Sequence, residues 1–326
     1  MVNGGDISGD SSVERGTSPA SHDSDRPVVE VTIIAVSYNS ARLLPDLFSS
    51  LPAATAGLES HEVVIVDNAS SDDSVKVARE MGPEVNVVAL PTNTGYAGAI
   101  NAGVDAAKPS KAILVLNDDI RLHERSILPM LEALDDPQIG ITVPVLVDPA
   151  GRLLKSLRRE PSVSRIFGEA ILGGDRSGRF KALGEVVQDP AAYERRSRAA
   201  WASGSAWLIS RRCWDAVGPW DESYFLYAED IDYALRSRDA GYSVLLVPEA
   251  RATHLVGPSH RDPRLWSMSV WNRYRVFRRR HGPIRSAAFR LGLILNELIR
   301  ALMGRSIHRA GLAALLMESR RPPEVR

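Results

Sequence analysis

The chain has 326 residues, of which 44% are hydrophobic and 25% charged, and its formal net charge at pH 7 is zero. This composition is ordinary for a globular protein, and the balanced charge favours no particular class of partner. The single cysteine, Cys213, excludes an internal disulfide and a zinc site built from cysteines, and it favours a reduced, cytoplasmic setting.

Residues 1–27 are rich in Gly, Ser, Asp and Pro and contain no apolar run of the kind found in secretory signals. We expect a disordered N-terminal tail there. From residue 28 onward, short runs of β-branched residues alternate with stretches of helical periodicity. The expected strands cover residues 29–36, 62–67, 85–90 and 111–116, and the expected helices cover 41–51, 71–81 and 96–107.

Continuous apolar strands separated by helices of about ten residues predict a mostly parallel α/β sheet with helices on both faces. In such folds, ligands bind beyond the carboxyl ends of the strands. Four loops are expected at that edge, and all four are polar: residues 37–40, 68–71, 91–95 and 117–119. The sequence therefore predicts a ligand site where these loops meet.

The second half of the chain is less regular. Residues 139–147 predict a strand, and residues 160–198, rich in Gly, Arg and Ser, predict a mobile loop. Two further strands are expected at 203–210 and 242–248, with a helix between them at 229–240. The C-terminal part is expected to be helical and basic, because residues 258–326 contain fifteen arginines and four acids, a formal charge of +11.

Asn117, Asp118 and Asp119 follow a buried strand at its carboxyl end. Carboxylate oxygens suit Mg²⁺ or Mn²⁺, which often keeps water ligands and shares the phosphates of a substrate. One well-placed carboxylate can therefore anchor a metal-bound diphosphate. The alternative is a turn that caps the next helix, since Asn and Asp favour turns.

Asp67 closes the second strand, where a carboxylate can accept the N–H of a pyrimidine or bind a ribose hydroxyl. Helix capping by Ser70 or Ser71 is compatible with that role. No G-x-G-x-x-G motif follows the first strand, which disfavours a nicotinamide or flavin dinucleotide. Residues 93–98 form a glycine-bearing loop suited to a close approach of ligand to backbone, although an ordinary strand-to-helix connection explains it equally well.

Glu229, Asp230 and Asp232 crowd the start of a helix, directly after the aromatic run at 224–227. Acids at a helix N-terminus are favoured by the helix dipole, which is the alternative explanation. A carboxylate beside a metal-bound diphosphate could instead deprotonate an acceptor hydroxyl as a general base. His254 follows the next strand, either as a ligand or as a structural histidine.

Taken together, these segments resemble glycosyltransferase family 2, whose members have the GT-A fold. The resemblance rests on VSYNS, VDNASSDDS, NTGYAGAINAG, LNDDI and the block that runs from SGSAW to RDAGY, which occur in that order between residues 29 and 254. The implied fold is a Rossmann-like α/β domain over residues 28–257, with a nucleotide-sugar half at 28–120 and an acceptor half at 121–257. The basic helical region at 258–326 would follow it.

The resemblance implies an inverting transfer from a nucleotide-diphosphate sugar in one displacement, with Mn²⁺ or Mg²⁺ on the leaving diphosphate. Asp230 would be the catalytic base, with Glu229 and Asp232 orienting it or the acceptor. Asp119 would bind the metal, and His254 would assist it. Contacts with the nucleotide sugar are implied for Ser37, Tyr38, Asn39, Asp67, Asn93, Gly95, Asn101, Asn117 and Asp118.

The processive members of the family carry a Q-x-x-R-W motif and transmembrane helices, and this sequence has neither, so one transfer per acceptor is expected. VSYNS, LNDDI and YAEDIDYALR most resemble bacterial rhamnosyltransferases of cell-wall and polysaccharide assembly. One subgroup adds L-rhamnose from dTDP-rhamnose to N-acetylglucosamine linked to polyprenyl diphosphate. A UDP-hexose or UDP-galactofuranose donor is the alternative within the family.

A lipid-linked acceptor would explain the basic C-terminal region. A spanning helix needs about 20 mostly apolar residues, and the apolar stretch at 284–303 is interrupted by Arg285, Arg290, Asn296, Glu297 and Arg300. We instead expect residues 266–303 to lie on anionic headgroups at the inner face of the plasma membrane, using arginines 273, 275 and 278–280 with Trp271 and Tyr274. A solvated arginine-rich face or a homodimer interface is the alternative, and no nucleic-acid-reading motif is present.

Two other functions stay open at this point. A sugar nucleotidyltransferase would carry a glycine-rich loop with a basic residue directly after the first strand, and VSYNSARLL lacks such a loop. A non-catalytic carbohydrate-binding or scaffold protein on the same fold would have lost its acids, yet Asp67, Asp119, Glu229 and Asp230 are all present.

Overall fold

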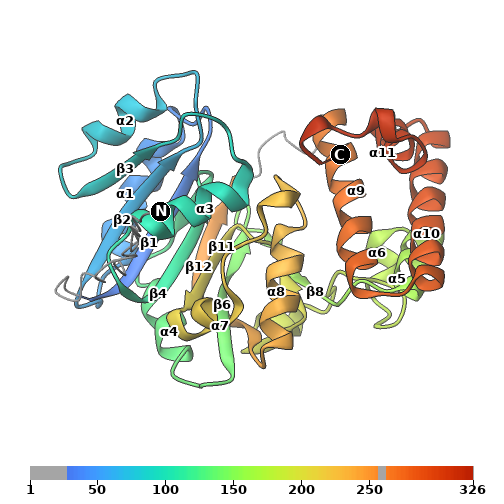
Figure 1. Cartoon of the computed structure of the whole chain (residues 1–326). Helices are drawn as coiled ribbons and strands as arrows, with labels where there is room; N and C mark the ends of the chain where they lie inside the picture. Colours follow the sequence, from blue (N-terminus) through green and yellow to red (C-terminus); the bar gives the residue numbers. More distant parts are fainter. Residues whose placement is uncertain (1–27, 256–261, 326) are drawn as a thin grey trace, which may run out of the picture.

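The computed structural model describes residues 28–255 and 262–325 (Figure 1). The disordered tail expected at residues 1–27 lies outside the described residues. The strands are β1 (Val29–Ser37), β2 (His61–Asp67), β3 (Val85–Ala89), β4 (Ser110–Asn117), β5 (Ile120–Leu122), β6 (Ile139–Val147), β7 (Leu153–Leu154), β8 (Leu157–Arg158), β9 (Ser197–Ala199), β10 (Trp201–Ala202), β11 (Ala206–Ser210) and β12 (Ser243–His254). The helices are α1 (Leu44–Ala54), α2 (Ser74–Glu80), α3 (Gly95–Ala106), α4 (Ile127–Ala133), α5 (Val163–Leu172), α6 (Gly174–Ser177), α7 (Arg211–Val217), α8 (Glu229–Asp239), α9 (Pro263–Arg280), α10 (Pro283–Leu302) and α11 (Ile307–Leu316).

A ten-stranded sheet forms the centre, with the order β3-β2-β1-β4-β11-β6-β12-β5, while β7 pairs with β6 and β9 with β12. The first four strands in this order run parallel to one another, as the sequence predicts. Strand β11 is antiparallel to both β4 and β6, and β12 is parallel to β6. Strands β8 and β10 form a separate two-stranded sheet.

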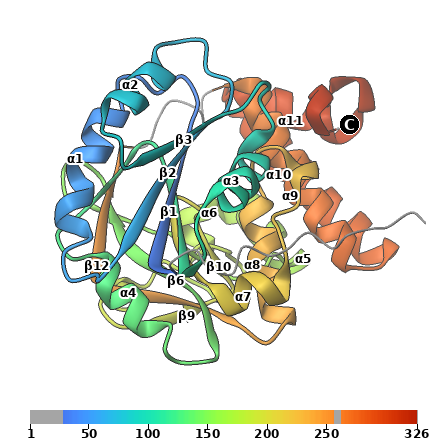
Figure 2. The same ribbon diagram turned by 60° about the vertical axis from the view of Figure 1, so that its left-hand side comes forward.

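Both faces of the parallel strands are buried. Along β1, Ile33 and Ala35 join one hydrophobic core, which α1 and α4 cover, and Ile34 and Val36 join the other, which α3, α7 and α8 cover. Helices α1 and α3 accordingly lie on opposite sides of the parallel strands (Figure 2). Each fully buried Ile or Leu side chain stabilises such a core by about 1.5–3 kcal/mol. The predicted α/β sheet with helices on both faces is confirmed.

Residues 160–198 contain more regular structure than their Gly, Arg and Ser content indicated. They include α5, α6, a short 3₁₀ turn at Pro190–Tyr193 and β9, so the expectation that a mobile loop covers these residues is wrong. The N-terminus of α5 is capped, because Ser162 Oγ accepts a hydrogen bond from Arg165 N at 3.3 Å. Half-buried Arg273 of α9 pairs with Glu169 and Glu185, which ties this segment to the C-terminal helices.

Helices α9, α10 and α11 stand together beside the sheet (Figure 1). A separate hydrophobic core joins them to α5, and at its centre Phe277 and Phe289 stack with ring centroids 3.9 Å apart. Asp262 caps α9 by accepting hydrogen bonds from Arg264 N and Leu265 N. No helix within the described residues is long and apolar enough to cross a membrane.

Candidate active site

The carboxyl ends of β1, β2 and β4 lie side by side at one edge of the sheet. Ser37 of β1 pairs with Asp67 of β2, and Val36 pairs with Asn117 of β4. The loop that leads into α3 joins them, because Leu90 N donates to Asp67 O at 2.9 Å. This register brings the four predicted polar loops together.

The loops after β1 and β2 interlock through Asn39. Its backbone is left-handed, with φ 56°, a conformation that Asn adopts more readily than most residues. Asn39 N donates to Ser70 Oγ at 2.9 Å, and Asn39 Oδ1 accepts from Ser71 N at 2.8 Å. Asn39 therefore fixes the two loops, and it leaves the neighbouring Tyr38 52% exposed at the mouth of the site.

Asp67 offers a buried carboxylate oxygen to a ligand. Its Oδ2 accepts from Ser70 N at 2.9 Å, but its Oδ1 has no hydrogen-bond partner among the residues that the structure describes. The same holds for the Ser37 hydroxyl, also within the described part of the chain. A buried acceptor without a donor costs about 1–3 kcal/mol, so an N–H or hydroxyl of a bound ligand would be stabilised here.

The first backbone amides of α3 already have protein acceptors. Thr94 N donates to Asn68 Oδ1 at 2.8 Å, Gly95 N to Asn93 Oδ1 at 2.9 Å, and Tyr96 N to Phe225 O at 2.7 Å. Gly95 has φ +78°, and a Cβ there would lie 2.2 Å from Phe225 O. The glycine thus permits a close approach of two protein segments, where the sequence predicted a close approach to ligand.

Asp118, Asp119 and His254 converge although His254 is far away in sequence. The pairing of β12 with β5 sets His254 opposite Ile120, which brings His254 Nε2 to 3.2 Å from Asp119 Oδ2. Asp118 Oδ2 accepts a hydrogen bond from the Ser40 hydroxyl. Burial, reinforced by the charge of Asp119, raises the pKa of Asp118 to about 6.

A divalent cation fits this arrangement only if the protein and a substrate diphosphate coordinate it together. Within residues 28–255 and 262–325, no group of three or more His, Cys, Asp or Glu side chains is placed to hold a metal ion. Mg²⁺ and Mn²⁺ commonly take one or two protein ligands and complete their shell with water and substrate phosphates. Asp119 and His254 would supply one oxygen and one nitrogen, so the residues present fit a metal held jointly with a diphosphate.

Glu229 and Asp230 begin α8 with unequal acidities. Asp230 Oδ1 accepts from Ile231 N at 2.8 Å and Oδ2 from Gly204 N at 3.1 Å. Burial outweighs these hydrogen bonds and raises the pKa of Asp230 to about 6. Burial and then the charge of Asp230 raise the pKa of Glu229 well above its usual range. Burial therefore disfavours the charged form of both carboxyl groups, and of Glu229 more strongly than of Asp230.

The approach to α8 is strained. Phe225, Tyr227 and Ala228 all have left-handed backbones, with φ of 60°, 66° and 72°. A non-glycine residue in this region costs about 1–3 kcal/mol and persists only where surrounding contacts enforce it. Such residues concentrate at functional sites, and these three directly precede Glu229 and Asp230.

Tyr96 connects the two groups of acids. Its hydroxyl lies 3.3 Å from Gly204 O, beside the glycine that contacts Asp230. Burial raises the pKa of Tyr96 well above its usual range, and the charges of four carboxylates raise it further: Glu229, Asp118, Asp119 and Asp230. Ser205 O accepts from Asn117 N at 3.0 Å, so residues 204–205 join the end of β4 to the start of α8. Sequence reasoning missed Tyr96, Gly204 and Asn68 as site residues, since their partners lie on distant segments.

Two predicted site residues face elsewhere. Asn101 is held within α3, where its amide donates to Trp220 O at 3.0 Å and accepts from Trp220 N at 3.0 Å. Asp232 forms an ion pair with Arg236 at 2.8 Å. Asp232 and Asn101 line the same surface hollow. Residues two apart on a helix point about 200° apart, so Asp232 is not brought beside Asp230.

Comparison with known proteins places the chain. Residues 32–183 match the model of "Glycosyl transferase family 2". An N-acetylglucosaminyl-diphospho-decaprenol L-rhamnosyltransferase of Mycobacterium tuberculosis is 32% identical over 245 residues, covering 71% of this chain and 78% of that protein. The chain belongs to glycosyltransferase family 2. A second family relative, the low-salt glycan biosynthesis hexosyltransferase Agl10 of Haloferax volcanii, is 23% identical over 64% of this chain and 62% of its own.

Solved glycosyltransferases share the fold. The mannosyltransferase PcManGT of Pyrobaculum calidifontis, in complex with GDP-Man and Mn²⁺, superposes with a TM-score of 0.55 at 17% identity, over 89% of this chain and 76% of its own. GalNAc-T7, with UDP, GalNAc and Mn²⁺, gives 0.54 at 16% identity, over 77% of this chain and 48% of its own. The protein is thus a glycosyltransferase enzyme with a GT-A-type α/β fold and a C-terminal helical extension, similar to rhamnosyltransferases.

Proposed function

We propose that this family 2 enzyme moves L-rhamnose from dTDP-L-rhamnose, with inversion, onto a hydroxyl of a glycan linked to polyprenyl diphosphate. The observation that carries the proposal is that residues 204–205 join two groups of acids. Gly204 N donates to Asp230 Oδ2 at the start of α8, and Ser205 O accepts from Asn117 N at the end of β4. A transferase needs these groups on either side of the reacting sugar carbon. The printed name of the 32% identical relative supports the sugar and the acceptor class.

The donor half would bind the nucleotide at the ends of β1 and β2. The open Oδ1 of Asp67 suits the N3–H of thymine or a ribose hydroxyl, and the exposed ring of Tyr38 suits stacking on the base. Asn117 and Asp118 would face the sugar and diphosphate beyond them. The same contacts would accept uracil, so a UDP-hexose or UDP-galactofuranose is the competing donor.

The chemistry would divide between the two groups of acids. Asp230 would take the proton of the attacking acceptor hydroxyl, while the neighbouring Glu229 would orient that hydroxyl by hydrogen bonding. A divalent cation held by Asp119 and His254 would stabilise the charge that develops on the leaving diphosphate. No carboxylate nucleophile is required for a single inverting displacement.

The donor assignment is tested by thermal unfolding of the purified protein with a panel of nucleotide sugars, each with and without Mn²⁺. A ligand that binds only the folded state stabilises it by about 2.7 kcal/mol at a hundredfold excess over its Kd. We expect the largest Mn²⁺-dependent shift with dTDP-L-rhamnose. A larger shift with a UDP-sugar would change the donor, and no shift with any donor would favour a non-catalytic carbohydrate-binding protein on the same fold.

We propose further that the C-terminal helices rest on the cytoplasmic face of an anionic bilayer, where a polyprenyl-linked acceptor resides. Among the described residues, ten of the twelve exposed large hydrophobic side chains lie on α5, after α6, or on α10 and α11 and the turns that follow them. Four of them line one face of α10: Ile284 (85% exposed), Leu291 (58%), Leu298 (39%) and Leu302 (79%). The acid of α10, Glu297, is buried, so the charges around this face are arginines.

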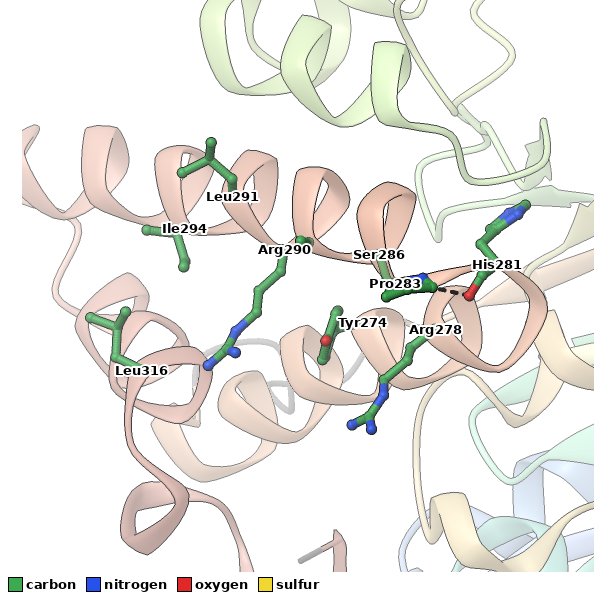
Figure 3. Close-up of a pocket in the computed structure, with 10 residues that line it drawn as sticks. Tyr274, Arg278, His281, Pro283, Ser286, Arg290, Leu291, Ile294 and Leu316 are labelled. Carbon is green, nitrogen blue, oxygen red and sulfur yellow. Dashed lines mark hydrogen bonds between the residues drawn. The ribbon is translucent and has the colours of Figure 1, made fainter.

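A groove between α9 and α10 lies beside this face and has matching character (Figure 3). Leu291, Ile294 and Leu316 gather at one end, and Arg278 and His281 lie toward the other. Apolar side chains next to cations suit the boundary between acyl chains and phosphate headgroups.

Replacing Leu291 and Leu302 together by glutamate should abolish sedimentation of the protein with vesicles of anionic phospholipid. Transfer to a short-chain, water-soluble acceptor should stay within about twofold, because neither side chain contacts the acids of the site. Binding of the wild type to neutral and anionic vesicles alike would contradict the electrostatic part of the proposal. A stable dimer without any vesicle binding would identify the face as a subunit interface.

A further inference from the structure

One face of α9 contacts the strained segment that precedes Glu229 and Asp230 of α8. Asn272, Arg275 and Arg279 are spaced three and four residues apart, so they point to the same side of the helix. All three contact residues 221–228, which comprise a 3₁₀ turn and the left-handed positions before Glu229. The C-terminal helices thus contact the segment that precedes Glu229 and Asp230.

Asn272 makes the central contact. It is fully buried, and its Nδ2 donates to Tyr224 O at 2.7 Å, Leu226 O at 3.0 Å and Tyr227 O at 3.2 Å. Its Oδ1 accepts from Arg275 Nη1 at 3.0 Å. Backbone carbonyls in a segment of irregular conformation lack the regular partners of a helix or a sheet. Here the two N–H groups of one side-chain amide are shared among three carbonyls, of which Tyr224 O also accepts from Leu226 N at 2.7 Å.

The two arginines hold the start of the same segment. Arg275 Nη1 donates to Ser223 O at 2.8 Å, and Arg279 forms an ion pair with Asp221. Both guanidinium groups also lie over the ring of Tyr224, 5.0 and 4.8 Å from its centroid. In its middle, the segment is held to α3 by the hydrogen bond from Tyr96 N to Phe225 O. Residues 221–228 are therefore held between α9 and α3.

We propose that Asn272 is a positioning residue for sugar transfer: its amide keeps the carbonyls of 224–227 in place, so that Glu229 and Asp230 begin α8 where the acceptor hydroxyl must lie. This proposal rests on the assignment of Asp230 as the base. A shift of about 1 Å in a reacting group lowers turnover by roughly a hundredfold, so loss of the amide should act on kcat.

The test compares Asn272→Ala and Asn272→Asp with Asn296→Ala in the full-length protein. Asn296 is a matched control, because it is also a buried asparagine of the helical region, and its amide donates to Glu297 and to nothing in 221–228. We expect kcat of Asn272→Ala to fall by about 10- to 100-fold while the donor KM changes less than about threefold. Asn272→Asp keeps the shape but turns the donor into an acceptor, so its kcat should fall at least as far. Asn296→Ala should keep kcat within about twofold.

Hydrogen exchange of the backbone amides supplies a readout that does not depend on activity. Amides of 222–231 should exchange faster in Asn272→Ala than in the wild type, and Asn296→Ala should leave them unchanged. An unchanged kcat in Asn272→Ala, or an equal loss in Asn296→Ala, overturns the positioning role. If the wild type transfers no sugar, the proposed function fails by itself. Unchanged exchange at 222–231 in Asn272→Ala would then separately overturn the role of Asn272 in holding this segment.

Discussion

Replacing Asp230 by asparagine should lower kcat for sugar transfer by about 10²–10⁴-fold, the usual contribution of a general base. Donor binding should change little, because the hydrogen bonds of the Asp230 carboxylate go to Gly204 and Ile231 and not to the polar residues at the ends of β1 and β2. Transfer is measured as release of nucleoside diphosphate, and donor binding by calorimetry on the same sample. Asp239→Asn is the control, since it makes the same change at the exposed C-terminal end of the same helix.

The fall of wild-type kcat at acid pH tests independently whether Asp230 is the base. Burial disfavours the charged form of Asp230 and raises its pKa to about 6, so the group is protonated below that pH and cannot accept a proton. We therefore expect kcat to fall as the pH drops through about 6, well above the value near 3.9 for an ordinary aspartate. Turnover near the wild-type level in Asp230→Asn, or a flat profile down to about pH 4, would show that another group is the base.

Replacing Asp119 by asparagine should remove most of the Mn²⁺-dependent stabilisation by the donor. The carboxylate lies 3.2 Å from His254 at the end of β4, and a neutral amide is a much weaker ligand for a hard cation. We expect kcat to fall by at least about a hundredfold, since the charge on the leaving diphosphate would lose its main counter-charge. The measurement is the thermal shift given by the donor with and without Mn²⁺, together with the rate of transfer.

Asp148→Asn is a suitable control for that experiment. Asp148 is an aspartate in the turn between β6 and β7, where it pairs with Arg152 at 2.7 Å, and it has no contact with the strand ends of the site. Its variant should keep the full Mn²⁺-dependent shift. If Asp119→Asn keeps that shift as well, Asp119 is not a metal ligand, and the role of His254 beside it falls too.

Local chemistry made the first half of the fold predictable. The β-branched runs of β1, β2 and β4 are continuous, so a parallel sheet buried on both faces followed, and with it the edge at which polar loops gather. The segment at 160–198 was misread because its Gly and Arg content masked the apolar spacing of Ile166 and Ala170, which face the core from α5. Tertiary packing decided there, as it often does for short amphipathic helices.

In the candidate site as well, positions were predictable from local sequence, whereas contacts between distant segments were not. Asp67 and Asp119 could be found from their place at strand ends, but the contact of Asp119 with His254 depends on the antiparallel pairing of β12 with β5. The contacts of Asn272 with 224–227 depend on the path of helices that no local pattern in the sequence describes. Helical geometry alone could have separated Asp232 from Asp230, because positions two residues apart face opposite sides.

The capped start of α3 has a consequence for how this enzyme achieves electroneutrality. Many nucleotide-binding folds neutralise phosphate with the free amides of a helix N-terminus. Here Asn68, Asn93 and Phe225 already occupy the amides of Thr94, Gly95 and Tyr96. In the proposed reaction, the compensation that a helix end would otherwise provide would come from the divalent cation, so occupancy by the donor would depend on that cation. Donor binding would then respond to the concentration of free Mg²⁺ or Mn²⁺.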